Sequence, residues 1–187
     1  MVPIPSLWLP ILVSAVVVFI LSAILHMVLP FHRNDFKKIA KEDQLLDALR
    51  SLEIPPGDYM VPCGTTPEAC KDPAFVAKMA KGPIVMMTVL KGGPMSMGKE
   101  LFQWFLFSVA VAIVAAYITG HALGAGADYR QVFRYAGCVT FVAYGFGLIP
   151  DSIWYKRSWV TTWKSVADAL IYALFSAGIF GWLWPKM

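Results

Sequence analysis

The sequence lacks the residue patterns that mark an active centre or a nucleic-acid surface. It has three histidines and three cysteines in 187 residues, and their spacing matches neither a redox nor a zinc motif. The loop Gly93–Glu100 has the glycines and Lys99 of a phosphate-binding loop, but Glu100 stands where Ser or Thr holds Mg²⁺. Residues 31–100 balance ten basic side chains against nine acidic ones, which excludes a nucleic-acid footprint. We expect no cofactor and no nucleic-acid partner.

Four long apolar stretches are present instead, at 6–28, 101–123, 132–149 and 165–184. Each has the length of roughly 20 residues that a helix needs to cross a bilayer. The hydrophobic fraction of 58% and mean hydropathy of +0.60 exceed those of ordinary soluble domains. The sequence therefore predicts an all-α membrane protein with four transmembrane helices, surrounded by membrane lipids.

The first stretch differs from a secretory signal, because no Lys or Arg precedes it and its apolar run is longer than a signal core. We expect it to remain as an anchor. The chain then divides into a first transmembrane helix at 6–28, a polar segment at 31–100, and a three-helix transmembrane region at 101–187.

Cationic residues predict the orientation, because cationic loops stay on the cytoplasmic side. Most of them flank the connections after the first and third spans: Arg33, Lys37, Lys38, Lys41, Lys91, Lys99, Lys156, Arg157 and Lys164. Tryptophans form two expected interfacial belts, with Trp104, Trp154, Trp159 and Trp163 at the inner boundary and Trp8, Trp182 and Trp184 at the outer one. Both termini are predicted outside and residues 31–100 in the cytoplasm.

The polar segment predicts a small α+β cap inserted between the first and second spans. Asn34 is placed to cap a helix that runs to about Leu52, where Pro55, Pro56 and Gly57 end it. A strand at 59–61, a helix at 73–81 and a strand at 83–90 follow. Two strands alone are marginally stable, so we expect the cap to pack on the bundle or on a partner.

Small residues recur every fourth position in two spans, which gives each helix a smooth face for close packing. The second span carries Ser108, Ala112, Ala116 and Gly120, and the fourth carries Ala169, Ala173, Ala177 and Gly181. These two strips have two interpretations. They pack the four helices within one bundle, or they dock a partner's helix.

Asp168 is the single carboxylate inside a predicted span, and ionisable residues within a membrane are functional candidates. Lys164 lies one turn earlier for an i, i+4 ion pair. Together these residues predict an inner-boundary charge cluster of Asp151, Lys156, Arg157, Lys164 and Asp168. The cluster has two interpretations, structural pairing and a proton, ion or lipid-headgroup site.

The sequence favours structural roles for its cysteines and histidines. Cys63 and Cys70 should be reduced thiols on the cytoplasmic side, and a disulfide between them would argue for the opposite orientation. No histidine from another span lies at the depth of His26, which disfavours haem, and spacing lends no support to a metal shared by His26, His32 and the two thiols.

Three stretches carry a resemblance to a family. His26-Met-Val-Leu-Pro-Phe-His32-Arg-Asn-Asp35, Pro55-Pro-Gly-Asp-Tyr-Met-Val-Pro-Cys63 and Pro150-Asp-Ser-Ile-Trp-Tyr-Lys-Arg-Ser-Trp159 resemble an uncharacterised family of small bacterial inner-membrane proteins. The resemblance implies four spans with a polar insertion after the first, and a place in the bacterial plasma membrane. It implies no activity.

The sequence therefore favours a non-catalytic accessory or assembly subunit of a larger membrane complex or a homo-oligomer. The alternative is a small transporter or channel element that uses the inner-boundary carboxylates. A third possibility is a thiol-dependent membrane enzyme acting through Cys63 and Cys70.

Overall fold

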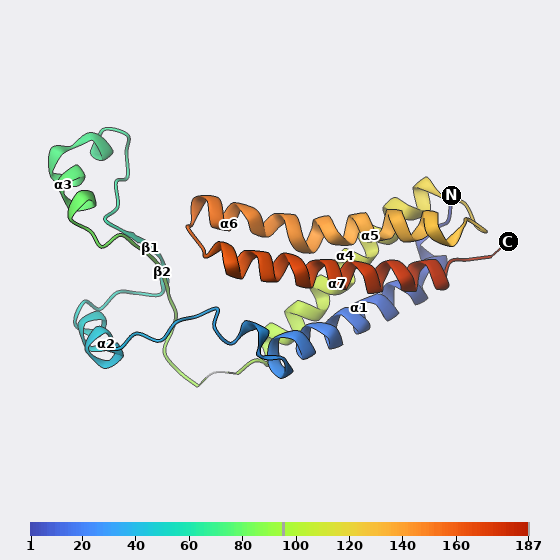
Figure 1. Cartoon of the computed structure of the whole chain (residues 1–187), viewed down its shortest axis with the longest axis horizontal. Coiled ribbons are helices and arrows are strands. Elements are labelled where there is room, and N and C mark those ends of the chain that lie inside the picture. The colour runs from blue at the N-terminus through green and yellow to red at the C-terminus, as the bar shows by residue number, and fades with distance from the viewer. Residues whose placement is uncertain (95, 187) are drawn as a thin grey trace. The chain divides into compact units, whose positions relative to one another are not determined.

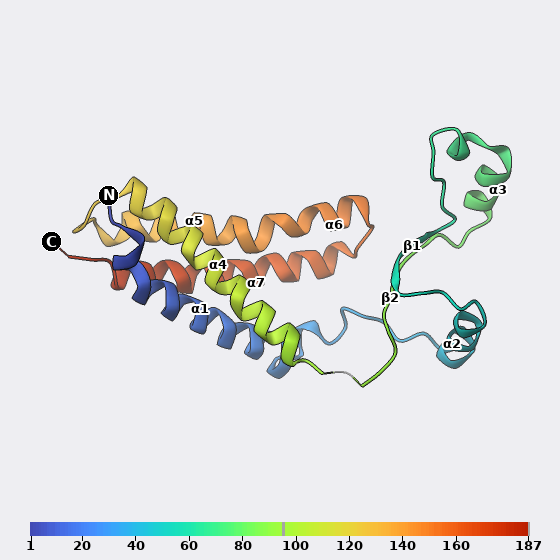
Figure 2. The same cartoon turned by 180° about the vertical axis from the view of Figure 1, so that it is seen from behind.

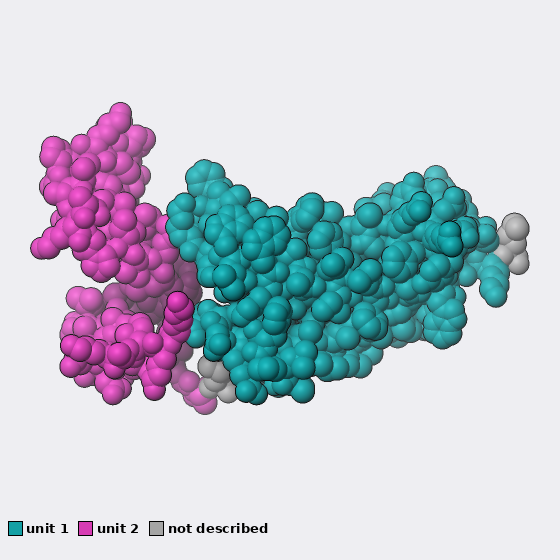
Figure 3. All heavy atoms as spheres, viewed as in Figure 1, with its two compact units in different colours: residues 1–36, 96–187 teal, residues 37–95 magenta. Residues whose placement is uncertain are grey.

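The computed structural model describes residues 1–94 and 96–186. Met95, in the loop that resembles a phosphate-binding motif, lies outside the described residues. The chain forms two compact units, a helical one from 1–36 and 96–186 and a smaller one from 37–94 (Figure 3). The helical unit contains four helical segments long and apolar enough to span a membrane, at Ile4–Val28, Gly98–Ala122, Tyr129–Trp154 and Trp159–Trp182. The prediction of a mainly helical protein with four such helices is confirmed.

Helix α1 (Trp8–Ala23) continues into a π-helical turn at Ile24–Val28, followed by α4 (Gly98–Ala122). Next, α5 (Tyr129–Gly145) leads through a 3₁₀ turn into α6 (Ile149–Trp154), and α7 (Trp159–Trp182) ends the bundle. Helices α5 and α7 lie side by side, and both termini lie at the same end of the bundle (Figures 1 and 2). The opposite end is where α1 finishes and α7 begins.

Helix α5 starts before the predicted apolar run because a local cap sets where it begins. The third run was expected from residue 132, but α5 begins at Tyr129. The Asp128 carboxylate accepts a hydrogen bond of 2.9 Å from the Arg130 amide, which satisfies one of the free amides at the helix start. Hydropathy marks the apolar part of such a helix and misses its polar first turn.

The two small-residue strips lie inside this chain's own bundle. Seven of their eight members are buried, and Gly181 is half-buried. A Cβ at Gly120 would lie 2.6 Å from the Val2 carbonyl oxygen, and one at Gly181 would lie 2.6 Å from the Tyr129 ring. Each strip therefore lets an element of the same chain approach closely. The geometry supports internal packing of the strips and gives no support for a partner helix there.

Apolar side chains close the bundle at the end that carries the termini. Leu7, Val132 and Phe180 are fully buried there, and Trp184 is almost so. The Trp184 indole nitrogen donates to the Gly124 carbonyl at 2.9 Å. This indole is thus a packing element with a satisfied donor, rather than a member of the outer belt. Five other tryptophans are exposed: Trp8, Trp154, Trp159, Trp163 and Trp182.

The smaller unit contains α2 (Glu42–Ser51), β1 (Gly57–Val61), α3 (Pro73–Lys81) and β2 (Val85–Val89). Its strands pair antiparallel, with Gly57 opposite Val89 and Val61 opposite Val85. The bounds of α3 match the predicted helix, and its first turn is capped by Asp72, whose carboxylate accepts from the Ala74 amide at 2.7 Å. The expectation that a helix starts at Asn34 is wrong, because residues 30–36 turn back onto the bundle and α2 begins only at Glu42.

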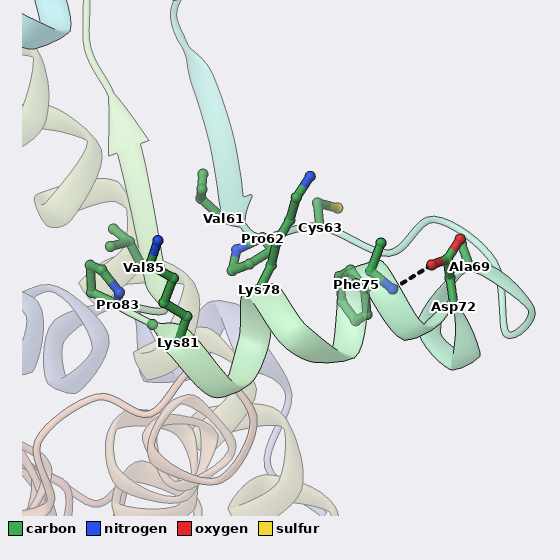
Figure 4. Close-up of a pocket in the computed structure, with 12 residues that line it drawn as sticks. Val61, Pro62, Cys63, Ala69, Asp72, Phe75, Lys78, Lys81, Pro83 and Val85 are labelled. Atoms are coloured by element: carbon green, nitrogen blue, oxygen red, sulfur yellow. Dashed lines mark hydrogen bonds between the residues drawn. The ribbon is translucent and has the colours of Figure 1, made fainter.

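No described residue of 37–94 is buried. A pocket of about 720 Å³ lies between α3 and the facing strand ends, and Phe75, Lys78 and Cys63 line it (Figure 4). Cys63 and Cys70 are both exposed free thiols. The unit thus has secondary structure without a core of its own.

Replacing Gly120 by alanine should destabilise the bundle by about 1–3 kcal/mol, the usual cost of overpacking, because the new methyl group would meet the Val2 carbonyl. Gly124 lies in the loop directly after α4, and a Cβ there meets nothing within 4 Å, so Gly124→Ala is the control. Thermal unfolding in detergent, followed by circular dichroism, measures both. Equal midpoints for the two variants would contradict the close approach of Val2 to α4.

Candidate functional site

The polar end of the bundle gathers two histidines around the buried carboxylate of α7. His26 lies in the π-helical turn that ends the first span, a local widening often found at functional sites. Pro30 then starts a 3₁₀ turn at Pro30–His32, which reverses the chain and brings His32 to α7. We call the resulting set His26, His32, Asp35, Lys164 and Asp168 the polar-end cluster.

His32 joins two carboxylates in this cluster. Its Nε2 lies 2.8 Å from Asp168 Oδ2, and its Nδ1 lies 2.6 Å from Asp35 Oδ2. The His26 ring stacks on the His32 ring with centroids 4.2 Å apart and planes 4° apart, and His26 Nε2 is 3.8 Å from Asp168 Oδ2. One carboxylate oxygen of Asp168 thus faces both imidazoles.

Lys164 fastens the returning chain to α7. Its ammonium group donates to the Phe31 carbonyl at 2.7 Å and to Asp35 Oδ1 at 2.8 Å. Burial alone would raise the pKa of the Asp35 carboxyl, but the hydrogen bonds from Lys164 and His32 outweigh it and hold that pKa below its usual value. Asp35 is therefore the shared anion between a lysine and a histidine.

The inner-boundary charge cluster expected from the sequence forms only in part. Lys164 pairs with Asp35, and no ion pair between Lys164 and Asp168 occurs in the described part of the chain. Asp151 contacts its neighbours through its backbone carbonyl, which accepts from the Tyr155 and Arg157 amides. Lys156 donates to the Ile153 carbonyl. The i, i+4 rule failed for Lys164 because a carboxylate from a distant turn competes for the same ammonium.

A cavity of about 270 Å³ lies beside Asp168, and Arg157 and His26 are among the residues that line it. Four aromatic rings form its walls: Trp104, Phe107, Tyr144 and Tyr172. The Tyr144 and Tyr172 centroids are 5.4 Å apart, within the usual range of aromatic packing. We call this space the aromatic cavity.

Two polar atoms of residues that line the aromatic cavity have no hydrogen-bond partner, Asp168 Oδ1 and the Tyr172 hydroxyl. Asp168 is 2% exposed and Tyr172 is 3% exposed. A buried polar atom without a partner costs about 1–3 kcal/mol, and more when it is charged. Such atoms indicate a place where something else supplies the missing hydrogen bonds.

Sequence reasoning singled out Asp168 and Lys164 but missed their partners. His32 and Asp35 are 136 and 129 residues distant from them, and hydropathy says nothing about a turn that folds back on the bundle. Pro30 between the two histidines was the available signal, because proline ends a helix and favours a turn. Trp104 was assigned to a belt, whereas its indole nitrogen donates to Ser22 Oγ at 2.8 Å beside the aromatic cavity.

Comparison of the chain with protein-family models, with curated proteins and with solved structures gives no match.

Removing the Lys164 ammonium should loosen the returning turn. Lys164→Ala leaves the partly buried Asp35 carboxylate without its cation, and the expected loss of stability is about 1–3 kcal/mol. The matched control is Lys156→Ala, whose ammonium group is exposed and donates to one carbonyl. Thermal unfolding measures the stability. The rate of trypsin cleavage after Arg33 and Lys37 measures how firmly the turn is held. Unchanged cleavage in Lys164→Ala would contradict the anchoring role.

Proposed function

We propose that the chain is a multi-pass membrane protein that binds the polar head of an amphiphilic molecule in the aromatic cavity. The observation that carries the proposal is the pair of buried, unpartnered polar atoms, Asp168 Oδ1 and the Tyr172 hydroxyl, on residues of one cavity. Aromatic walls with a few convergent polar groups are typical of small-molecule sites.

The chemistry of these atoms selects the ligand. An ionised carboxylate oxygen accepts hydrogen bonds only, so the bound head must offer a donor, such as a hydroxyl or an amine. The Tyr172 hydroxyl either donates or accepts. Arg157 also lines the cavity and is exposed, which places a cation where a phosphate or another anionic group of the ligand would be accommodated.

An apolar crevice accommodates the rest of the molecule. It has a volume of about 230 Å³ and shares His26 and Trp104 with the aromatic cavity. Its remaining walls are Phe19, Ser22, Ala23, Met27, Met97 and Leu101. A hydrocarbon chain that enters from lipid is held there by van der Waals packing against these walls, because lipid tails already shield it from water. Head and chain of one amphiphile thus have separate, adjoining environments.

Binding fits the bundle better than conduction, the alternative expected from the sequence. Asp151 does not join Asp168 in one cluster, and apolar residues including Leu7, Val132 and Phe180 fill the bundle at the terminal end. An ion or proton path needs polar groups or water along its length. The buried carboxylate and the two histidines lie together at one end of the bundle, which suits a ligand that enters from that end or from the side.

Removal of the Tyr172 hydroxyl should weaken retention of the amphiphile about tenfold, the equivalent of one hydrogen bond. The measurement is native mass spectrometry of the chain released from nanodiscs of phosphatidylethanolamine. Tyr172→Phe is compared with Tyr117→Phe, which removes the hydroxyl of an exposed tyrosine on the same bundle. Equal lipid retention in both variants would contradict a ligand site at Tyr172.

A second candidate function is that of an accessory subunit, and one separate observation favours it. The unit 37–94 buries none of its described residues, yet it exposes large apolar side chains that include Leu45 and Leu46. A unit without a core gains little from hydrophobic burial and needs a covering surface. We propose that a protein partner, or a second copy of the chain, supplies that surface.

Extraction in a mild detergent followed by native mass analysis tests the accessory role. We expect a species heavier than the 20.7 kDa monomer, because the apolar face of α2 is covered in the complex. Substitution of Leu45 and Leu46 by lysine should release the monomer. Asp47→Lys changes the charge of the same helix without removing apolar surface and should leave the complex intact. A stable monomer of the natural chain under several detergents would contradict the role.

A further inference from the structure

We propose that His26, His32 and Asp168 bind one divalent first-row transition-metal ion at the polar end of the bundle. One possible ligand atom from each of the three residues, a ring nitrogen of each histidine and a carboxylate oxygen of Asp168, lies within 4.8 Å of the other two. The three ligands come from a π-helical turn, a 3₁₀ turn and a long helix, so the fold itself assembles the set. The site uses none of the four aromatic rings of the aromatic cavity, although His26 and Asp168 also line that cavity, and it goes beyond the binding of an amphiphile.

The backbone fixes the tautomer of His26 that a metal requires. Its Nδ1 lies 3.1 Å from the Ser22 carbonyl oxygen, and because a carbonyl only accepts, Nδ1 carries the hydrogen. In the neutral ring Nε2 then has a free lone pair. That nitrogen is the one that lies 3.8 Å from Asp168 Oδ2.

His32 needs a cation between itself and Asp168. Its Nδ1 donates to the Asp35 carboxylate at 2.6 Å, which leaves a lone pair on Nε2 of the neutral ring. Nε2 faces a carboxylate oxygen at 2.8 Å, and two acceptors repel at this distance. A proton on His32 Nε2, a proton on the Asp168 carboxyl or a metal ion resolves the contact. Of the three, only the metal ion also uses the lone pair of His26.

The ligand spacing suits a metal ion. Bonds of about 2.0–2.2 Å to nitrogen and oxygen place neighbouring tetrahedral ligands about 3.4 Å apart. The two measured separations from Asp168 Oδ2, 2.8 Å to His32 and 3.8 Å to His26, lie on either side of that value. The two imidazole planes are stacked, 4° apart, and a ring-nitrogen lone pair lies in the plane of its ring. Metal binding therefore requires the half-exposed His26 ring to rotate out of the stack, so that its Nε2 and that of His32 point at the same ion.

The surrounding groups match those of metal centres. A ligating histidine usually donates its other ring nitrogen to a carboxylate, which orients the ring and raises its basicity. Asp35 does so for His32, and Lys164 holds Asp35 in turn. His26 has a side chain 49% exposed, which gives the ion an entry path, while His32 and Asp168 lie deeper.

Two imidazoles and one carboxylate select the ion class. Imidazole suits Zn²⁺, Fe²⁺ and Co²⁺, whereas Mg²⁺ and Ca²⁺ prefer oxygen ligands. Three protein ligands leave at least one coordination position open. Both His26 and Asp168 line the aromatic cavity, so the open position lies where a bound ligand or water reaches the ion.

Titration with Co²⁺ and Zn²⁺ tests the proposal on the full chain, purified in detergent without a polyhistidine tag and stripped of metal. We expect one equivalent of Co²⁺ to give visible absorption bands of a low-coordinate site, and Zn²⁺ to displace them. His26→Ala removes a half-exposed ligand, and His32→Ala removes the deeper one. Both should lower the affinity at least 100-fold, and Asp35→Asn about 10- to 100-fold.

His121→Ala is the matched control, because the third histidine is exposed and bonds only to its own helix through Tyr117. It should bind metal like the natural chain. Binding that is equal in the natural chain and in His26→Ala would overturn the proposal and leave His32 as a protonated bridge between two carboxylates. Tyr172→Phe removes no metal ligand, so loss of lipid retention with intact metal binding, or the reverse in His32→Ala, separates this proposal from the amphiphile site.

Discussion

A carboxylate buried in a bundle of helices that are apolar enough to span a membrane needs a partner, and the pairing of Asp168 with His32 governs the polar half of this molecule. An ionised group in hydrocarbon costs several kcal/mol unless a partner compensates it. The partner here comes from beyond the end of the first span, so the chain must reverse at Pro30 and lie back against α7. The position of Asp35 and the contact of Lys164 with Phe31 follow from that reversal.

Different interactions hold the helices together in the two halves of the bundle. At the terminal end, alanines, glycines and a few large side chains such as Phe180 pack with almost no polar contacts, as expected where lipid removes the hydrophobic drive between helices. At the other end the same four helices spread around aromatic rings and ionisable groups. Because the helices pack closely at one end, the bundle does not need side chains to fill the aromatic cavity at the other end.

The sequence predicted those features that depend on composition along a single segment. The four spans, the short α3 and the two-stranded pairing all follow from hydropathy, capping and β-branched runs. It also singled out Asp168 as a candidate, because a lone carboxylate stands out in an apolar helix. It could not predict that Lys164 would pair with Asp35 in place of Asp168, or that the Trp104 indole would donate to Ser22. These outcomes depend on which distant groups compete for the same atom. The spacing of residues within one segment carries no information about that competition.

The boundary between the two units lies directly after the returning turn, at residue 36, one position past Asp35. Asp35 in turn contacts both Lys164 and His32. Asp168 is one hydrogen bond further on. The start of the polar insertion is thus connected to the buried carboxylate by a short series of side-chain contacts as well as by the chain itself.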